Sequence, residues 1–565
     1  MAYDRPPPAS GLAQSAAIAV PGPDRSARNP GSAARPEHQA AAKTGRLALA
    51  TIVVFGVWLG MSGSLMLYVA TYTRNLPYND DWELVPELTG ATPITLEWLF
   101  ARHNEHRFFL PRAFLLTAIY GTGLNFRAGP FLDAGILSAA ALGMILTARR
   151  LRGCSRVSDA MFPLLCTNLG HYENLCYNFP TSFILVTGLA CLLLMIIVRR
   201  ANGFWGGLGA AACMILMPLA GVQGLLLSFP APVWLFLIGI KRRGKFGYAL
   251  AAGTVLVAAG VAFFCRPEIQ PNSHASLSLS FSQSFTTALK IIGMGSGPKV
   301  LPISDFTEWA LIAAVVGGVL LAFEKARGRG DTRLLEAFAL VALCAAIGSL
   351  FFAVPGVQRF LQTLPIPSGI VASNSYVWPA PYWGDLALAI WVLSAGVLLR
   401  GSWQRKEWSR PIALCCFVAC LLLLGLAIGY GRAGGASSTE GHNRYRSLMI
   451  PVLCWAYFVW EIDGGRLVKR LLPPVALVAA AAIAITYIPE AIAYGETFAY
   501  GQDRFRDALQ SGQSADQLAS SNAKNFNFLN RDKAFADCIL MLRDAGHPAF
   551  QRVPPRPAGD ANSSK

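Results

Sequence analysis

The stretch RLALATIVVFGVWLGMSGSLMLYVA occupies residues 46–70 and carries no charge after its first residue. A helix needs about 20 apolar residues to cross the hydrocarbon core of a bilayer, so this run is long enough. It begins too far from Met1, and is too long, to be a cleaved signal peptide, so it predicts a signal-anchor span. The preceding residues 1–45 are rich in Pro, Ala, Ser and Arg and are expected to form a disordered cytoplasmic tail.

The composition of the whole chain also indicates a membrane protein. Of 565 residues, 54% are hydrophobic and only 14% are charged, and the mean hydropathy is +0.43. A soluble domain has about a quarter of its residues charged. The net charge of +16 comes from Lys and Arg in short clusters between apolar runs, with no basic face. It therefore reflects membrane topology and does not indicate a nucleic-acid partner.

Twelve further apolar runs follow the first one. They lie at residues 129–148, 158–172, 179–198, 204–219, 222–240, 246–265, 307–323, 333–354, 380–399, 411–430, 446–462 and 471–489. The sequence therefore predicts an all-α, polytopic membrane protein with about thirteen transmembrane helices, in a membrane domain at 46–490.

The stretch FFLPRAFLLTAIYGTGL, residues 108–124, decides which loops share a side. If it crossed the membrane, every later loop would change sides; as an interfacial helix, it leaves every predicted cytoplasmic loop basic. These loops are Arg149–Arg152, Arg199–Arg200, Lys241–Arg243, Lys325–Arg333, Arg405–Arg410 and Arg466–Arg470. We therefore expect a juxtamembrane helix in the first outer loop, residues 71–128. The chain is expected in the plasma (inner) membrane, with a cytoplasmic N-terminus and an outer helical tail at 491–565.

Polar groups are concentrated in the predicted outer segments. Six of the seven histidines, all except His38, fall in these segments. The predicted spans carry almost no charge near their middles. Ion-coupled transporters usually place charged groups inside the membrane, so the pattern favours an active or binding site at the outer surface. The sequence has no CxxC pair or Cys/His array that would indicate a metal site.

The densest polar cluster follows the first span and begins with the adjacent carboxylates Asp80 and Asp81. Two carboxylates at a membrane surface are costly to desolvate unless they meet a cation, a proton or a substrate hydroxyl. The alternative is that one of them only caps a short helix. The cluster continues with His103, Glu105, His106, Arg107 and Arg112. These neighbours favour a functional role for the acidic pair.

The spacing of His103 and His106 would place both on one face of a helix, which would suit two metal ligands. Ordinary hydrogen bonding is the favoured alternative for these histidines. Glu105 is expected to pair with Arg107 or with a sugar hydroxyl.

The turn HYENLCYN, residues 171–178, mixes aromatic, carboxylate and amide side chains, as sugar-binding sites do. Its candidate binding residues are His171, Glu173 and Asn174. The alternative is an ordinary solvated turn. Cys176 in this turn and Cys538 in the tail are the two cysteines expected outside.

A third outer cluster lies before the predicted span at 446–462. Its members are Arg432, Arg444, Tyr445 and Arg446. Outer arginines oppose the positive-inside trend, so three of them close together indicate an anionic partner. A lipid phosphate would suit, because guanidinium groups bind it in a bidentate way. The alternative is that these side chains only reach toward the headgroups.

Together these features resemble the GT-C superfamily of integral-membrane glycosyltransferases, which includes protein O-mannosyltransferases and lipid A aminoarabinose transferases. The resemblance lies in the order of motifs, best over residues 46–240. The motifs are Asp80-Asp81 at the start of the first outer loop, the juxtamembrane helix, Arg127 and Arg149-Arg150 at the ends of the second span, the turn at 172–177, Gly221–Gly224, and later Arg444-Tyr445. The stretch His103–Arg107 replaces the His-Pro-Pro of many relatives, which leaves the acceptor and the subfamily open.

The resemblance implies a transferase that moves a sugar from a polyprenyl-phosphate donor at the outer face, with inversion. Asp80 matches the first acidic residue of the family and would be the base. Asp81 would orient the acceptor or a divalent cation. The three arginines Arg432, Arg444 and Arg446 would stabilise charge on the phosphate.

The expected partners are the lipid-linked sugar donor, membrane lipids, and an envelope glycan, lipid or protein as acceptor. Two alternatives remain open. One is a transporter or flippase of lipid-linked sugars, and the other is a non-catalytic membrane protein on the same fold.

Overall fold

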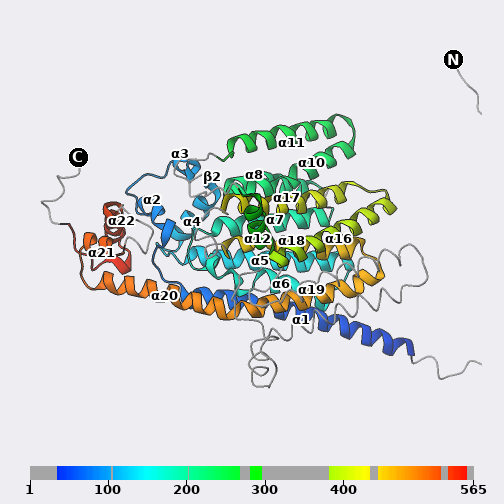
Figure 1. Ribbon diagram of the computed structural model, residues 1–565, viewed down its shortest axis with the longest axis horizontal. Helices are drawn as coiled ribbons and strands as arrows, with labels where there is room; N and C mark the ends of the chain where they lie inside the picture. The colour runs from blue at the N-terminus through cyan, green and yellow to red at the C-terminus, as the bar shows by residue number, and fades with distance from the viewer. Residues whose placement is uncertain are drawn as a thin grey trace, which may run out of the picture. The chain divides into compact units, whose positions relative to one another are not determined.

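The structure is a computed structural model that describes residues 35–103, 106–200, 203–267, 280–295, 381–432, 443–522 and 532–556. The chain divides into two compact units, residues 1–49 and residues 50–565. The described part of the second unit is a helical bundle (Figure 1). The strands β1 and β2 are two residues each and pair antiparallel.

The elements follow one another along the chain. The first half holds α1 (Arg35–Tyr72), η1 (Asn79–Leu84), α2 (Val85–Leu88), α3 (Leu96–Phe100), β1 (Arg102–His103), β2 (His106–Arg107), α4 (Phe109–Gly121), α5 (Ala128–Arg152), η2 (Val157–Ala160), α6 (Met161–Cys166), η3 (Leu169–Leu175), α7 (Thr181–Val198) and α8 (Phe204–Ala220). The second half holds α9 (Val222–Ser228), α10 (Pro230–Arg242), α11 (Gly244–Phe264), α12 (Phe281–Met294), α16 (Pro381–Arg405), α17 (Ser409–Arg432), η4 (Asn443–Tyr445), α18 (Arg446–Asp463), α19 (Arg466–Thr486), α20 (Ile488–Gln510), α21 (Ala515–Asn522), α22 (Asp532–Asp544) and η5 (Pro548–Phe550). Helix α1 begins inside the segment expected to be a disordered tail, where the sequence EHQAAAK contains good helix formers.

Seven helices in the described ranges are long and apolar enough to cross a membrane. They are Leu49–Tyr72, Ala128–Arg152, Thr181–Val198, Val222–Arg242, Gly244–Phe264, Ser409–Gly431 and Arg466–Gln510. This finding supports an all-α fold embedded in a membrane, but it does not confirm thirteen spans. The expected runs 307–323 and 333–354 lie outside the described residues.

The expected span at 158–172 is not one helix, so that prediction was wrong. The apolar run is divided into η2, α6 and the start of η3. Asn168 ends α6, because its Nδ2 donates to the carbonyl oxygens of Leu164 and Leu165 at 2.8 Å each. Its Oδ1 accepts a hydrogen bond from the Gly170 amide at 2.9 Å. One amide side chain thus satisfies backbone groups that the break leaves without helical partners.

Although broken, this segment still returns from one end of the bundle to the other. Near its start, Asp159 accepts a hydrogen bond from Arg152 at the end of α5. Just after it, Thr181 donates to Asp133 near the beginning of α5 at 2.8 Å. At 1.5 Å per residue the two α5 residues are about 28 Å apart along the helix. The break therefore leaves the expected sides of the later loops unchanged.

The core of the second unit is centred on α18, whose side chains are buried along almost the whole helix. Helices α7, α16 and α19 contact it. A helix that is apolar on all sides fits only inside a bundle, which explains its position.

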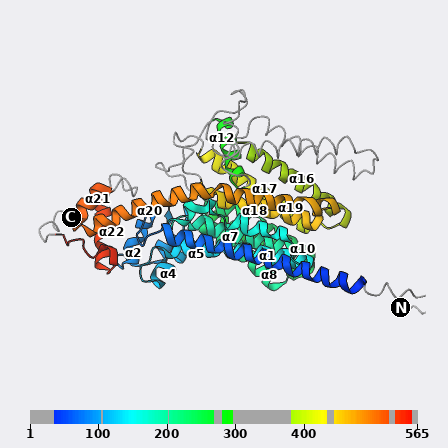
Figure 2. The same cartoon turned by 90° about the horizontal axis from the view of Figure 1, so that it is seen from below.

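A smaller core joins the segment between α1 and α5 to the C-terminal tail. Trp82 packs against Phe535 and Phe505, with ring centroids 4.8 and 6.1 Å away, and Phe126 and Phe550 belong to the same cluster. We name this cluster the cap. Helices α2, α21, α22 and the end of α20 gather there in both views (Figures 1 and 2). The tail is therefore packed on the loop rather than being a segment of its own.

An ionic network lies at the far end of α5, where the side chains of Arg152, Asp159 and Glu461 are buried and that of Arg156 is exposed. Arg152 Nη2 donates to Asp159 at 2.5 Å, and the hydroxyl of Tyr457 donates to the same carboxylate at 2.7 Å. Arg156 Nη1 donates to Glu461 at 2.9 Å. The network ties α5 and η2 to the end of α18.

Helix α4 is too short to be a span. Its 13 residues extend about 20 Å, against about 30 Å for the hydrocarbon core. We predict that a reporter fused after Leu124 and one fused after Tyr72 are found on the same side of the membrane. Protease protection of the two fusions measures this, and opposite sides would overturn the interfacial assignment of α4.

Helices α8 and α9 approach closely at Gly224, where a Cβ would collide with the carbonyl of Met217. We predict that Gly224→Ala lowers the melting temperature of the purified chain by several degrees, because overpacking costs about 1–3 kcal/mol. Gly260→Ala, which has open space around it, is the matched control and should melt like the wild type. Equal melting of both variants would contradict the close approach.

Candidate functional site

Three segments far apart in the sequence meet at one end of the bundle. The turn with Glu173 and Asn174 lies between η1 and η4. Asn178 Nδ2 donates to Asp81 Oδ2 at 2.9 Å. The Arg444 amide donates to Glu173 Oε2 at 3.2 Å, and Asn174 Nδ2 donates to the Arg444 carbonyl at 3.1 Å. The structure thus brings together members of all three clusters that the sequence singled out.

Asp81 is buried, with 1% of its surface exposed. Its Oδ2 also accepts hydrogen bonds from the backbone amides of Tyr78 and Asn178, at 3.2 and 3.3 Å. The capping alternative is therefore realised, together with the contact across to Asn178. Burial raises the pKa of Asp81 from 3.8 to about 7, despite the opposing effect of these hydrogen bonds, and the charge of Asp80 adds to the rise. Its Oδ1 has no hydrogen-bond partner in the described part of the chain.

Asp80 stands beside Asp81 on η1 and is half-buried. It is therefore the more accessible carboxylate of the pair. The phenol of Tyr177 lies close enough to feel the charges of Asp80, Glu173 and Arg444. One charged neighbourhood thus contains carboxylates from two segments and an arginine from a third.

Aromatic and acidic residues of α20 border this neighbourhood, although they were not among the predicted site residues. The hydroxyl of Tyr172 donates to Glu490 at 2.7 Å and also contacts Asn443. The ring of Tyr494 lies 4.8 Å from that of Tyr172. The only signal for them was an acidic residue directly after the last apolar run, at Glu490.

His171 and Arg446 lie inside the protein, each with 1% of its surface exposed. The guanidinium of Arg446 stacks over Tyr487, 3.5 Å from the ring centroid, and a Cβ on Gly170 would collide with it. Its Nε and Nη1 lack hydrogen-bond partners among the described residues. Arg446 is therefore not a surface residue reaching toward headgroups.

Of the other two expected arginines, the structure describes the side chain of Arg444 but not that of Arg432. Arg432 is the last residue of α17, and its side chain lies outside the described residues. Arg444 has its guanidinium 5.6 Å from the ring centroid of Tyr445, which is buried and packs edge-on against Phe183. Arg444 also feels the charge of Glu173.

Arg107 and Arg112, expected to bind substrate, make hydrogen bonds that hold the first loop together. Arg107 donates to the carbonyl oxygens of Phe264 and Phe100, at 2.9 and 2.7 Å. Arg112 Nη1 donates to the carbonyl oxygens of Trp98 and Ala101, at 2.8 and 2.7 Å. Their donors meet backbone carbonyls, so both side chains stabilise the loop, and substrate binding by them stays a prediction.

The prediction that His103 and His106 share one face of a helix was also wrong. These residues face each other across the β1–β2 pair. His103 Nδ1 lies 3.0 Å from Glu83 Oε2, and its ring packs between Phe108 and Phe179. Glu105 and the side chain of His106 lie outside the described residues. Within the described ranges, no group of three or more His, Cys, Asp or Glu could hold a metal ion.

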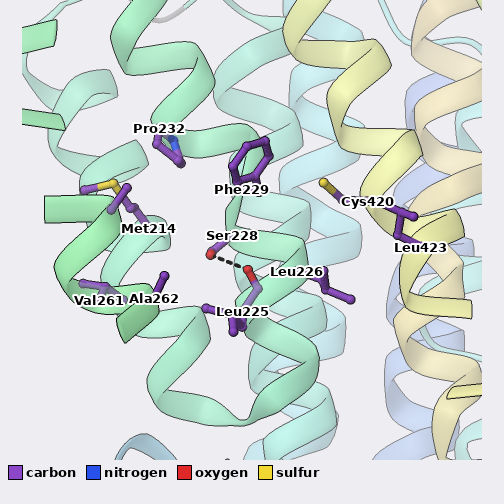
Figure 3. A pocket seen from close by; sticks show the side chains of 11 residues that line it. Met214, Leu225, Leu226, Ser228, Phe229, Pro232, Val261, Ala262, Cys420 and Leu423 are labelled. Atoms are coloured by element: carbon purple, nitrogen blue, oxygen red, sulfur yellow. Dashed lines mark hydrogen bonds between the residues drawn. The ribbon is translucent and has the colours of Figure 1, made fainter. Parts of the chain in front are cut away.

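An apolar cavity of about 340 Å³ lies between α8, α9, α10, α11 and α17 (Figure 3). Ser228, which lines it, donates its hydroxyl to the Leu225 carbonyl at 2.9 Å and so offers little to a polar ligand. Val261 also lines it, one turn from Phe264, which binds Arg107 of the first loop. The cavity thus suits hydrocarbon and lies near the end of the bundle that carries the acidic pair.

Because the pKa of Asp81 is raised in the folded chain, the free energy of unfolding depends on pH. The folded chain binds a proton at this carboxyl near pH 7, whereas the unfolded chain does so near pH 4, so the group favours folding as the pH falls from 8 to 5. The contribution changes by up to about 1.4 kcal/mol per pH unit. We predict that Asp81→Asn shows a smaller change in melting temperature between pH 8 and pH 5 than the wild type.

The exposed Asp507 provides the control, since Asp507→Asn should keep the wild-type pH dependence. Thermal denaturation of the purified chains in one detergent at both pH values gives the comparison. An Asp81→Asn variant with the wild-type pH dependence would contradict the burial effect.

Comparison with family models, curated proteins and solved structures found no match to the chain. The resemblance to the GT-C superfamily therefore rests on the quoted motifs and their order, and the activity of the chain is a proposal.

Proposed function

We propose that the chain is a membrane glycosyltransferase that moves a sugar from a polyprenyl-phosphate donor to an acceptor on the outer face of the plasma membrane. The observation that carries this proposal is the meeting of Asp80 and Asp81 with Glu173 and Arg444 at one end of an apolar bundle. Carboxylates beside an arginine provide a base and a phosphate contact within one neighbourhood.

Asp80 is the proposed base, because it is the accessible carboxylate of the pair. It takes the proton of an acceptor hydroxyl while that oxygen attacks the anomeric carbon. The bond from this carbon to the phosphate oxygen breaks, and the polyprenyl phosphate leaves with the electron pair. A single displacement inverts the configuration at the anomeric carbon.

Asp81 and Arg444 have supporting roles in this mechanism. The carboxylate of Asp81 is fixed by Asn178 and Tyr78, so it holds the turn that presents Asp80. Arg444 stabilises the charge that develops on the departing phosphate. A polyprenyl phosphate is a good leaving group at neutral pH, so the mechanism needs no strong acid.

The apolar cavity supports a lipid-linked donor. Its lining of Met, Leu, Phe, Val and Ala side chains suits the hydrocarbon part of such a donor and not a sugar (Figure 3). A water-soluble nucleotide sugar has no hydrocarbon chain that could fill this cavity.

A transporter of lipid-linked sugars is the second candidate. The buried Arg446, whose Nε and Nη1 have no hydrogen-bond partner among the described residues, favours it together with the buried His171, because polar groups inside a membrane protein often mark a transport path. Transport moves the donor without consuming it, whereas transfer releases free polyprenyl phosphate.

We predict that Asp80→Asn lowers sugar transfer about 100- to 10,000-fold, the usual contribution of a general base. Cells lacking the chain are supplied with either the wild type or the variant, and mass spectrometry of their envelope glycans and polyprenyl-phosphate lipids measures transfer. Membrane insertion and expression should be unchanged, and Asp507→Asn is the matched control.

Wild-type glycans in cells with Asp80→Asn would reject this residue as the base. Glycans that are unaltered even without the chain, with no accumulation of lipid-linked donor, would reject the transferase itself.

A further inference from the structure

A second, smaller hollow of about 90 Å³ lies where the end of α10 meets the start of α17. Arg200, Lys241 and Arg242 line it. Helix α7 begins just after Asn178, which binds Asp81, and ends just before Arg200. Its 18 residues extend about 27 Å, so the hollow lies at the opposite end of the bundle from the candidate active site.

The hollow contains hydrogen-bond donors that the fold does not satisfy. Trp234 lines it with 2% of its surface exposed, and its indole Nε1 has no hydrogen-bond partner in the described part of the chain. A buried tryptophan N–H usually finds one. Ser409 also lines the hollow and begins α17, where the first backbone amides have no acceptor within the helix.

The charge around the hollow is also unbalanced. Glu407 is its only lining carboxylate in the described ranges, and it is ion-paired with Arg200. Arg410 lies close to both, has 5% of its surface exposed, and its Nε has no hydrogen-bond partner among the described residues. Glu407 is thus shared between Arg200 and Arg410, so a second anion in the hollow would stabilise the buried guanidinium of Arg410 and the cations that line the hollow.

The volume of the hollow and the residues around it limit which ligands can bind there. The volume of about 90 Å³ is well below the roughly 300–1,000 Å³ of sites for whole small molecules, so it admits a phosphate group and not a nucleotide. Trp403, Trp408 and Trp205 are exposed near this end of the bundle, with Trp408 next to Ser409. Exposed tryptophans are typical of the boundary between lipid and water.

We propose that this hollow binds the phosphate group of an anionic phospholipid headgroup. The guanidinium and ammonium groups and the N-terminus of α17 supply the positive field, and the indole N–H of Trp234 donates to a phosphate oxygen. The lipid then joins α10 to α17 at the basic end of the bundle.

Thermal denaturation of the full chain in detergent tests the proposal, with short-chain phosphatidylglycerol as the probe. The lipid should raise the melting temperature of the wild type. In Trp234→Phe and in Lys241→Gln, about tenfold more lipid should be needed for half of the effect, because a hydrogen bond to a charged group is lost. Trp205→Phe and Arg150→Gln, exposed residues outside the hollow, are the matched controls.

The two sources of phosphate are separated by adding inorganic phosphate in place of lipid. Stabilisation by phosphatidylglycerol alone assigns the site to a headgroup, and equal stabilisation by inorganic phosphate assigns it to the free ion. The proposal is overturned if neither probe stabilises the wild type, or if the hollow and control variants respond alike.

Discussion

The polar turn between α6 and α7 has to find hydrogen-bond partners inside an apolar bundle, and the rest of the structure depends on how it does so. Asn178 binds Asp81, Asn174 binds the Arg444 carbonyl, and Tyr172 binds Glu490. These contacts join the segment between α1 and α5, the start of α18 and the start of α20 at one point. Two of these bonds involve carboxylates, and hydrogen bonds to charged groups contribute about 1.5–3 kcal/mol each, so the turn helps to hold these segments together.

The acidic pair stands between two cores. Asp81 faces the bundle through Asn178, whereas the next residue, Trp82, is buried in the cap against Phe535. Two adjacent residues of the short helix η1 thus contact different cores, Asp81 the bundle and Trp82 the cap. The position of Asp80 is therefore set by the bundle and the cap together, and the tail contributes to the candidate site without supplying a predicted site residue.

Sequence periodicity predicted long elements well and local breaks poorly. Helix α22 lies in the tail at 491–565 that was expected to be helical, because amphipathic spacing is a local property of the sequence. The helix break at Asn168 could not be predicted from the sequence, because a single amide side chain is often tolerated inside an apolar helix. The partnership of Arg107 with Phe264, 157 residues away, also depends on tertiary contact that no local pattern carries. Clustering of the three polar segments was predictable because charge bias placed them on one side; the contacts of Glu490 were not.

The ionic network at the far end of α5 has a consequence for how the chain is made. Arg156 pairs with Glu461, which follows it by 305 residues. At about 5–20 residues per second, a ribosome needs roughly 15–60 s to reach that glutamate. During this interval the arginine cannot have its final partner, and its charge is available to orient the emerging helices. Once α18 arrives, this exposed side chain pairs with the buried Glu461, so the same residue first guides insertion and then joins the start of η2 to α18.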